Sequence, residues 1–187
     1  KTMAIPHEFT AEAIAEANNL KLAVFQNRRW DSDFKTVQKV IHDTMLGELV
    51  EVEFHFDRYN PNLSPKIHKE TANPGAGILK DLGPHIIDQA LCLFGLPDAV
   101  FADIRLIRES TLVDDYIDIL MYYPDLRLRL KAGFFVREPN PAYCIHGKKG
   151  SFLKHRGDVQ EEDLKGGKKP NLTHWGTELP GNEGLLH

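Results

Sequence analysis

The segment from Gly75 to Gly95 places the strongest constraint on the fold, because it is apolar around nearly its whole helical circumference. At about 100° per residue, a helix over this segment gathers its polar side chains into one stripe roughly 60° wide. A helix this apolar must be largely buried, so the stripe faces either a cleft or an internal hydrogen-bond network. The stripe consists of Asp81, His85, Asp88 and Cys92.

Asp81 and His85 stand about one helical turn apart in this stripe. A neighbouring carboxylate can orient an imidazole ring, stabilise the imidazolium and raise the histidine pKa toward the range where it exchanges protons. Pro84 lacks a backbone donor, so the helix is expected to kink or to begin there, with Asp81 in the cap region. Two other interpretations stay open: a structural pair inside a core, and a metal site of Asp81, His85 and Asp88.

Beyond this segment, the hydrophobic pattern predicts more strands than helices. Helical spacing recurs at residues 9–17 and 34–45. Strands are predicted at 22–25 (buried), 49–57 (one wet face), 100–107, 116–123, 126–135, 143–146 and 151–155. Because strands mostly follow strands, the order favours an α+β domain with a mainly antiparallel sheet. After Arg156 no regular structure is expected, so residues 157–187 are predicted to form an irregular tail.

Composition excludes several classes of partner. A net charge of −4 argues against nucleic acid as a main ligand. No apolar stretch approaches the ~20 residues that cross a bilayer, so no membrane partner is expected. The two cysteines, Cys92 and Cys144, lie in apolar runs, which fits a reducing cytoplasm, the predicted location.

The chain lacks a dinucleotide-binding fingerprint. No Gly-x-Gly-x-x-Gly follows a strand, and the nearest match, Pro74 to Gly77, lacks both the preceding strand and the third glycine. Any dinucleotide-binding half must therefore lie outside these residues. The chain also opens on Lys1 and closes on a turn-like stretch at 181–187, so we expect a fragment of a larger protein.

Polar residues that follow predicted strands are candidate ligand contacts. Asn27 and Arg28 follow the strand at 22–25, and Arg58 follows the strand at 49–57. Taken alone, these residues are more typical of solvated loops than of substrate contacts.

Four ordered motifs together resemble the C-terminal domain of the glucose–fructose oxidoreductase, inositol dehydrogenase and rhizopine-catabolism (Gfo/Idh/MocA) family. The fourth motif contains Gly-x-Gly-x-x-x-Asp-x-Gly-x-His-x-x-Asp, which is fairly specific. Within the family, the branch of scyllo-inositol dehydrogenases looks most similar, and the resemblance runs from about Lys1 to Trp175. The motifs span Gln26 to Phe34, Leu46 to Glu48, His55 to Arg58, and Pro74 to Leu91.

The resemblance implies a two-domain NAD(P)-dependent oxidoreductase whose Rossmann domain lies outside this chain. Residues 1–187 would form a single substrate-binding and oligomerisation domain, an open sheet with helices packed on one face. The implied reaction moves a hydride between the cofactor and a secondary alcohol of a sugar or polyol, such as an inositol. The implied assembly is a homodimer or a larger homo-oligomer formed through the sheet, and the fragment alone is expected to be inactive.

The resemblance also implies roles for individual residues. The catalytic dyad of the family falls on Asp81 and His85, with His85 as general acid/base and Asp81 as its partner. Lys1 matches the lysine that ends the cofactor domain and also serves the active site, although Thr2 stands in place of the family's proline. No metal is expected, and the alternative function is a non-catalytic ligand-binding or dimerisation domain. The candidates for substrate binding are Asn27, Arg28, Arg58 and Asp88.

Overall fold

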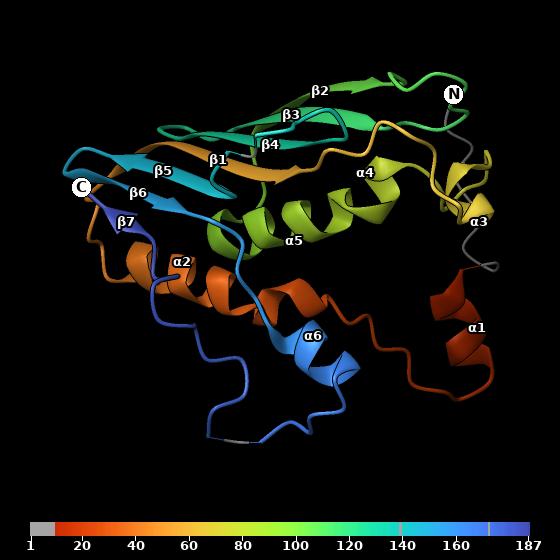
Figure 1. Ribbon diagram of the computed structural model, residues 1–187, viewed down its shortest axis with the longest axis horizontal. Coiled ribbons are helices and arrows are strands. Elements are labelled where there is room, and N and C mark those ends of the chain that lie inside the picture. Colours follow the sequence, from red (N-terminus) through yellow and green to blue (C-terminus); the bar gives the residue numbers. More distant parts are fainter. Residues whose placement is uncertain (1–9, 139, 172) are drawn as a thin grey trace.

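The computed structural model describes residues 10–138, 140–171 and 173–187, and in this part of the chain seven strands form one open sheet (Figure 1). The strand order across the sheet is β2-β3-β4-β1-β5-β6-β7. The strands are β1 (Leu49–Asp57), β2 (Ala99–Arg105), β3 (Tyr116–Tyr122), β4 (Arg127–Gly133), β5 (Tyr143–Gly147), β6 (Gly150–Lys154) and β7 (Leu185–Leu186).

The sheet is mainly antiparallel, as predicted. Only β1 and β4 run parallel among the described strands; the other neighbours are antiparallel. The turn predicted at Pro124 and Asp125 joins β3 to β4, and Gly147 pairs with Gly150 at the β5–β6 turn. The predicted fold class, α+β with an open, mainly antiparallel sheet, is confirmed.

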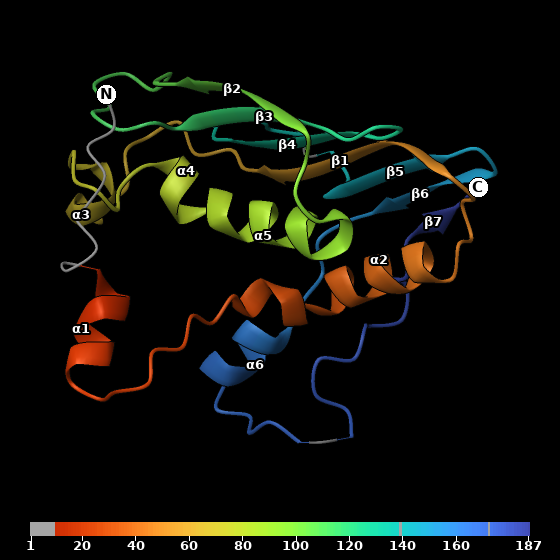
Figure 2. The ribbon, with the colours of Figure 1, turned by 180° about the vertical axis from the view of Figure 1, so that it is seen from behind.

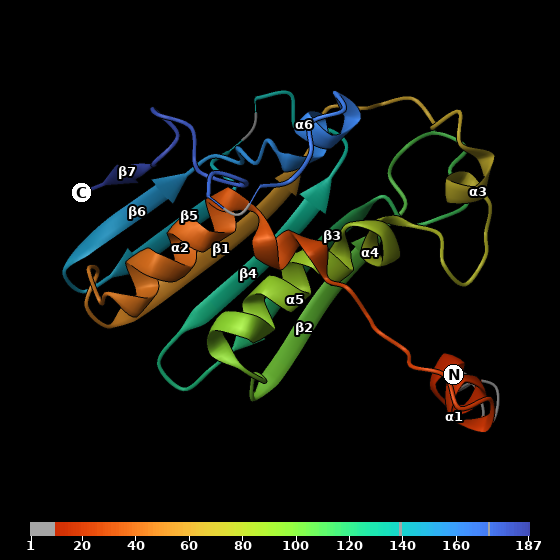
Figure 3. The same ribbon diagram turned by 90° about the horizontal axis from the view of Figure 1, so that it is seen from below.

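Helices α2 and α5 cover one face of this sheet (Figures 2 and 3). Helix α2 confirms the helical spacing that begins at Phe34, although it ends before Met45. The helices are α1 (Ala11–Ala17), η2 (Asn27–Trp30, a 3-10 turn), α2 (Ser32–His42), α3 (Ile67–Glu70), α4 (Ile78–Asp81), α5 (Gly83–Phe94) and α6 (Gln160–Lys165).

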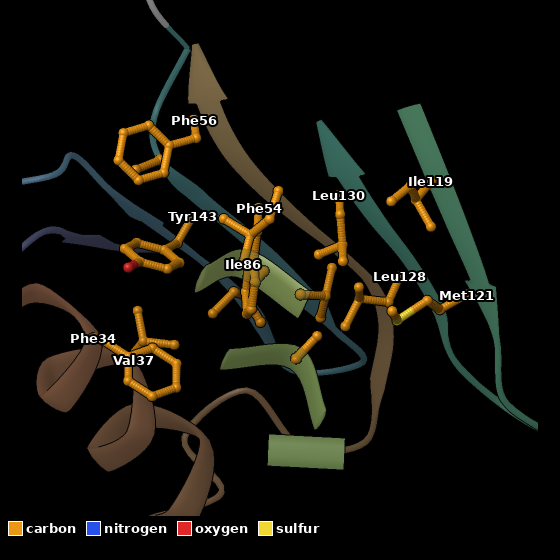
Figure 4. Packing of buried hydrophobic residues seen from close by; sticks show 14 of the residues in the cluster. Phe34, Val37, Phe54, Phe56, Ile86, Ile119, Met121, Leu128, Leu130 and Tyr143 are labelled. Carbon is orange, nitrogen blue, oxygen red and sulfur yellow. The ribbon is translucent and has the colours of Figure 1, made fainter. Parts of the chain in front are cut away.

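The core lies between these two helices and the covered face of the sheet (Figure 4). Phe34 of α2, Ile86 of α5 and Phe54 of β1 are fully buried. Tyr143 of β5 packs edge-on against Phe54, with ring centroids 5.1 Å apart. Burying an aromatic or aliphatic side chain of this kind stabilises a fold by about 1.5–3 kcal/mol, so this layer holds α5 firmly against the sheet.

The alternation predicted for the strands holds on β4 and only partly on β1. In β4, Leu128 and Leu130 are buried on the helix side. The basic residues that alternate with them, Arg127, Arg129 and Lys131, lie on the open face. In β1, His55 lies on the face predicted to be wet but is only 5% exposed. Its ring is flanked by the carboxylates of Glu53 and Asp57 at 2.8 and 3.1 Å, which satisfy both ring nitrogens and allow burial.

The prediction of a strand at residues 22–25 is wrong. Val24 and Phe25 are about three-quarters exposed (78% and 75%) and belong to an irregular connection. Among the described residues, no strand pairs with the backbone of this segment, which a strand requires. The helix predicted before it forms as α1, which Thr10 caps by accepting from the Ala13 N–H, and the predicted start at Phe9 lies outside the described residues.

The expectation of no regular structure after Arg156 is also wrong in two places. This region forms the short helix α6, and β7 pairs with the outer edge of β6. The tail folds back because the buried ammonium of Lys154 needs partners, which it finds in the carboxylate of Glu178 at 3.0 Å and the carbonyl of Asn182. Among the described residues, no helix is long and apolar enough to cross a membrane.

Candidate functional site

The polar stripe of the apolar segment is split between two helices. Helix α4 ends at Asp81 and α5 begins at Gly83, with Leu82 at the junction, so the break predicted near Pro84 is present. Proline suits the first turn of a helix, where its missing N–H is no loss. The start of α4 is held by Asp114, whose carboxylate accepts from the Leu79 N–H at 2.7 Å.

His85 lies in the first turn of α5 and is half-buried. Its Nδ1 is buried without a hydrogen-bond partner among the described residues. Burial lowers the pKa of His85, and the nearby Arg28 lowers it further, while Asp81 opposes both. Asp81 raises the pKa of His85 as expected, but the expected net rise is wrong, because desolvation of the ring outweighs the carboxylate. The imidazole is accordingly neutral at neutral pH.

Asp81 is paired with a lysine rather than with His85. Both of its carboxylate oxygens accept from Lys69 Nζ at 2.8 Å, and no hydrogen bond joins Asp81 to His85 in the described structure. The predicted dyad is thus close enough for electrostatic coupling but is not a bonded pair. Lys69 comes from α3, in the connection between β1 and α4.

The far end of the stripe faces η2 and α2. Asp88 accepts two bonds of 2.6 Å from Arg29, a bidentate pair, so a substrate would have to compete with that arginine for it. Cys92 is exposed, with its Sγ 3.9 Å from the side-chain nitrogen of Gln38. Among the described residues, no three His, Cys, Asp or Glu side chains are arranged to hold a metal ion.

Arg28 and Asn27 sit together on η2 but differ in surroundings. Arg28 is partly buried and pairs with Asp31 and Glu161, each at 3.3 Å. Its backbone carbonyl accepts from the buried amide of Gln89 at 3.0 Å, which anchors η2 to α5. Asn27 is exposed, and it lines neither of the two hollows near this region.

Two hollows adjoin this region, and Arg58 lines both of them. The first, about 510 Å³, is lined by Asp81 and Lys69 among others. The second, about 390 Å³, is lined by Arg28 and Arg156 among others. His85 lines neither of them, although residues of both hollows affect its pKa: Asp81 of the first raises it, and Arg28 and Arg156 of the second lower it.

Two neighbours of the site were missed at the level of sequence. Lys69 stands in a Pro- and Asn-containing connection without periodicity, so no local pattern pointed to it. Arg156 comes just after β6, the same strand-end signal that selected Arg28 and Arg58, and that signal could have found it. Lys1, predicted to serve catalysis and cofactor binding, lies outside the described residues.

Comparison with known proteins gives consistent matches. A sequence profile of the GFO/IDH/MocA C-terminal domain matches residues 34–153. The uncharacterised oxidoreductase YdgJ of Escherichia coli is 37% identical over 94% of this chain and 50% of its own length. The Bacillus subtilis scyllo-inositol 2-dehydrogenase (NADP(+)) IolW is 38% identical over 95% of this chain and 49% of its own length.

Solved structures show the same similarity. The structure of yvaA from Bacillus subtilis has a TM-score of 0.82 and 37% identity, covering 94% of this chain and 49% of that protein. A structure from Bacteroides fragilis has a TM-score of 0.80 and 39% identity, covering 97% of this chain and 53% of that protein. The chain therefore spans about half the length of the relatives it matches.

Proposed function

The chain belongs to the GFO/IDH/MocA oxidoreductase family, whose C-terminal domain it contains, and from this premise we propose a reaction for the full-length protein. It transfers a hydride between NAD(P) and a secondary alcohol of a sugar or polyol. The name of IolW, an NADP-dependent inositol dehydrogenase 38% identical to this chain, supports a polyhydroxylated substrate. The domain described above supplies the substrate pocket and the group that moves the proton.

The observation that carries this proposal is the state of His85. A half-buried imidazole whose pKa lies below its usual value is neutral at neutral pH, which is the form a general base requires. Its charged neighbours line the two hollows: Asp81, which raises its pKa, lines the first, and Arg28 and Arg156, which lower it, line the second. A histidine kept only for structure would have its buried nitrogen bonded, whereas Nδ1 of His85 has no partner in the described chain.

The residues of this chain fit the substrate side of a nicotinamide-dependent oxidation. When bound, the cofactor supplies or accepts the hydride, and the protein contributes orientation and proton transfer. His85 is the group of this chain that would exchange the proton of the substrate hydroxyl. The cofactor's phosphates need a glycine-rich loop that this sequence lacks, so residues outside the chain would hold them.

The proton path follows from the charges around His85. In the oxidative direction, the neutral ring takes the proton of the substrate hydroxyl and becomes imidazolium. Asp81 and Asp88 both favour that cation, because each raises the pKa of His85, whereas Arg28 opposes it. Lys69 holds the Asp81 carboxylate in place through hydrogen bonds of 2.8 Å to both of its oxygens. In the reductive direction the same ring returns the proton to the forming alkoxide.

Substitution of His85 in the full-length protein tests this role. We expect His85→Ala to reduce turnover of a polyol with NAD⁺ or NADP⁺ by ~10²–10⁴-fold, the usual contribution of a general acid/base. His42→Ala is a matched control, because that histidine side chain is 89% exposed on α2. In the active enzyme, oxidation should also speed up as the pH rises through the lowered pKa of His85. Equal turnover in the two variants would show that His85 does not transfer the proton. It would favour the alternative function, a non-catalytic ligand-binding domain.

We also propose that the open face of the sheet mediates self-association. Helices cover the other face, and the register of β2 with β3 sets Phe101 opposite Leu120, on the face without helices. Phe101 is 58% exposed, and Tyr122 of β3 is exposed on the same side. Apolar side chains left uncovered on a sheet face are typical of interfaces.

A further inference from the structure

The second hollow brings together three arginines from distant parts of the chain. Arg28 comes from η2, Arg58 follows β1, and Arg156 follows β6. The hollow measures about 390 Å³, which is large enough for part of a sugar-sized molecule. The other side chains around it are those of His55, Phe56, Asp57, Asn140, Ala142 and His155.

Two of the three guanidinium groups lack a carboxylate partner among the described residues. Arg156 donates only to neutral oxygens, the Tyr143 hydroxyl at 3.5 Å and the His55 carbonyl at 3.3 Å. Within the described chain Arg58 forms hydrogen bonds through its backbone alone, with Gly133 and Val136, and its guanidinium forms no ion pair. Both guanidinium groups instead contact the ring of Phe56, at 5.1 Å for Arg58 and 4.1 Å for Arg156.

The hollow contains little negative charge to balance them. Asp57 is the one carboxylate among the described residues that line it, and its side chain is only 2% exposed and bonded to His55 at 3.1 Å. The positive charge of Arg28 is neutralised by ion pairs with Asp31 and Glu161, which do not line the hollow. The positive charge that remains comes from Arg58 and Arg156.

In the first hollow two cations are matched by carboxylates, whereas Arg58, Lys66 and Lys80, which also line it, form no ion pair among the described residues. Lys69 pairs with Asp81, and the buried guanidinium of Arg108 pairs with Glu70 at 2.9 Å. Both hollows therefore carry an excess of positive charge, and the second differs in that its unpaired cations are guanidinium groups that share the ring of Phe56. Consistently, Arg28 and Arg156 both lower the pKa of His85.

We propose that the second hollow binds an oxyanion, a carboxylate or a phosphate, carried by the polyhydroxylated substrate, with Arg58 and Arg156 as its main ligands. Guanidinium groups bind both oxyanions in a bidentate, planar fashion. Two arginines held by an aromatic ring rather than by carboxylates are free to make those bonds. This inference rests on the proposed function and narrows its substrate class from neutral polyols to acidic or phosphorylated ones.

The test compares matched neutral and anionic sugars with the full-length protein. The kcat/KM values for D-glucose, D-glucuronate and D-glucose 6-phosphate are measured with NAD⁺ and with NADP⁺. We expect one anionic sugar to exceed D-glucose by ~10-fold or more, and the better of the two identifies carboxylate or phosphate. Arg156→Gln should reduce kcat/KM for the preferred anionic sugar ~10–100-fold, the scale of a lost charge-assisted bond, and abolish the preference over D-glucose.

A second variant and a control keep the result interpretable. Arg58→Gln removes an exposed side chain, so it tests the pocket even if Arg156→Gln fails to fold. Arg105→Gln removes the same charge from the exposed strand β2 and should keep the preference. Equal kcat/KM for neutral and anionic sugars overturns the inference, as does a preference that survives both pocket substitutions or a change confined to the KM of the cofactor.

Calorimetric titration with the same sugars separates this inference from the proposed function. Anion binding that both pocket substitutions abolish, in a protein without turnover, supports the oxyanion site and counts against the proposed function. Turnover of a neutral polyol without measurable anion binding supports the proposed function and overturns the oxyanion site.

Discussion

Gly77, where α4 begins, is the residue whose replacement should most directly disturb the candidate site. Its backbone has φ +94° and ψ 158°, a region that is almost exclusive to glycine. A Cβ added at this position would lie 2.1 Å from Oδ1 and 2.6 Å from Cγ of Asp114. That carboxylate holds the Leu79 N–H at the start of α4, so Gly77→Ala strains the backbone and displaces the cap together.

The magnitude follows from these two effects. Backbone strain in this region costs about 1–3 kcal/mol, and loss of a hydrogen bond to a charged group costs about 1.5–3 kcal/mol. Gly77→Ala should therefore reduce the free energy of unfolding by roughly 2.5–6 kcal/mol. Because α4 carries Asp81 at its last residue, turnover of the full-length protein should fall as well.

Urea unfolding of the 187-residue chain, followed by circular dichroism, measures the loss. Gly75→Ala is the matched control, because its φ is ordinary and its new Cβ would meet nothing closer than Asn73 Oδ1 at 3.6 Å. In an Asp114→Ala background the side-chain collision disappears, so Gly77→Ala should cost less there than in the wild type. If Gly77→Ala and Gly75→Ala were equally stable, the conclusion that Gly77 and Asp114 together position the start of α4 would be wrong.

Two further predictions concern α2 and the sheet. Burial raises the pKa of Asp31 to about 6 from 3.8, against the opposing effect of Arg28. The folded protein therefore binds a proton that the unfolded chain releases, and stability falls as the pH rises from about 4 to about 6, by at most about 3 kcal/mol. Asp31→Asn should remove this part of the pH dependence in urea unfolding at several pH values, and an unchanged pH profile would refute it. Phe101→Glu, on the open sheet face, should shift the full-length protein to a smaller species in light scattering; an unchanged mass would exclude this face from the interface.

The main elements of the fold could be predicted because their patterns are local. The apolar alternation of β4 and the helical spacing beginning at Phe34 reflect backbone periods of two and 3.6 residues, which neighbouring residues alone express. The exposed run at 22–25 shows the limit of such patterns. Its composition is that of a buried strand, but a strand also needs a partner, and local sequence does not provide one.

By itself, the sequence determined which side chains share the polar stripe and that the segment carrying it breaks near Pro84. The tertiary structure decided what those groups do: Asp81 is held by Lys69, Asp88 by Arg29, and the pKa of His85 is lowered instead of raised. The physical reason is the difference in sequence range between the two kinds of interaction. Helical periodicity is set within a few residues, whereas the charge state of a half-buried imidazole depends on desolvation and on ions supplied by segments far away in the chain.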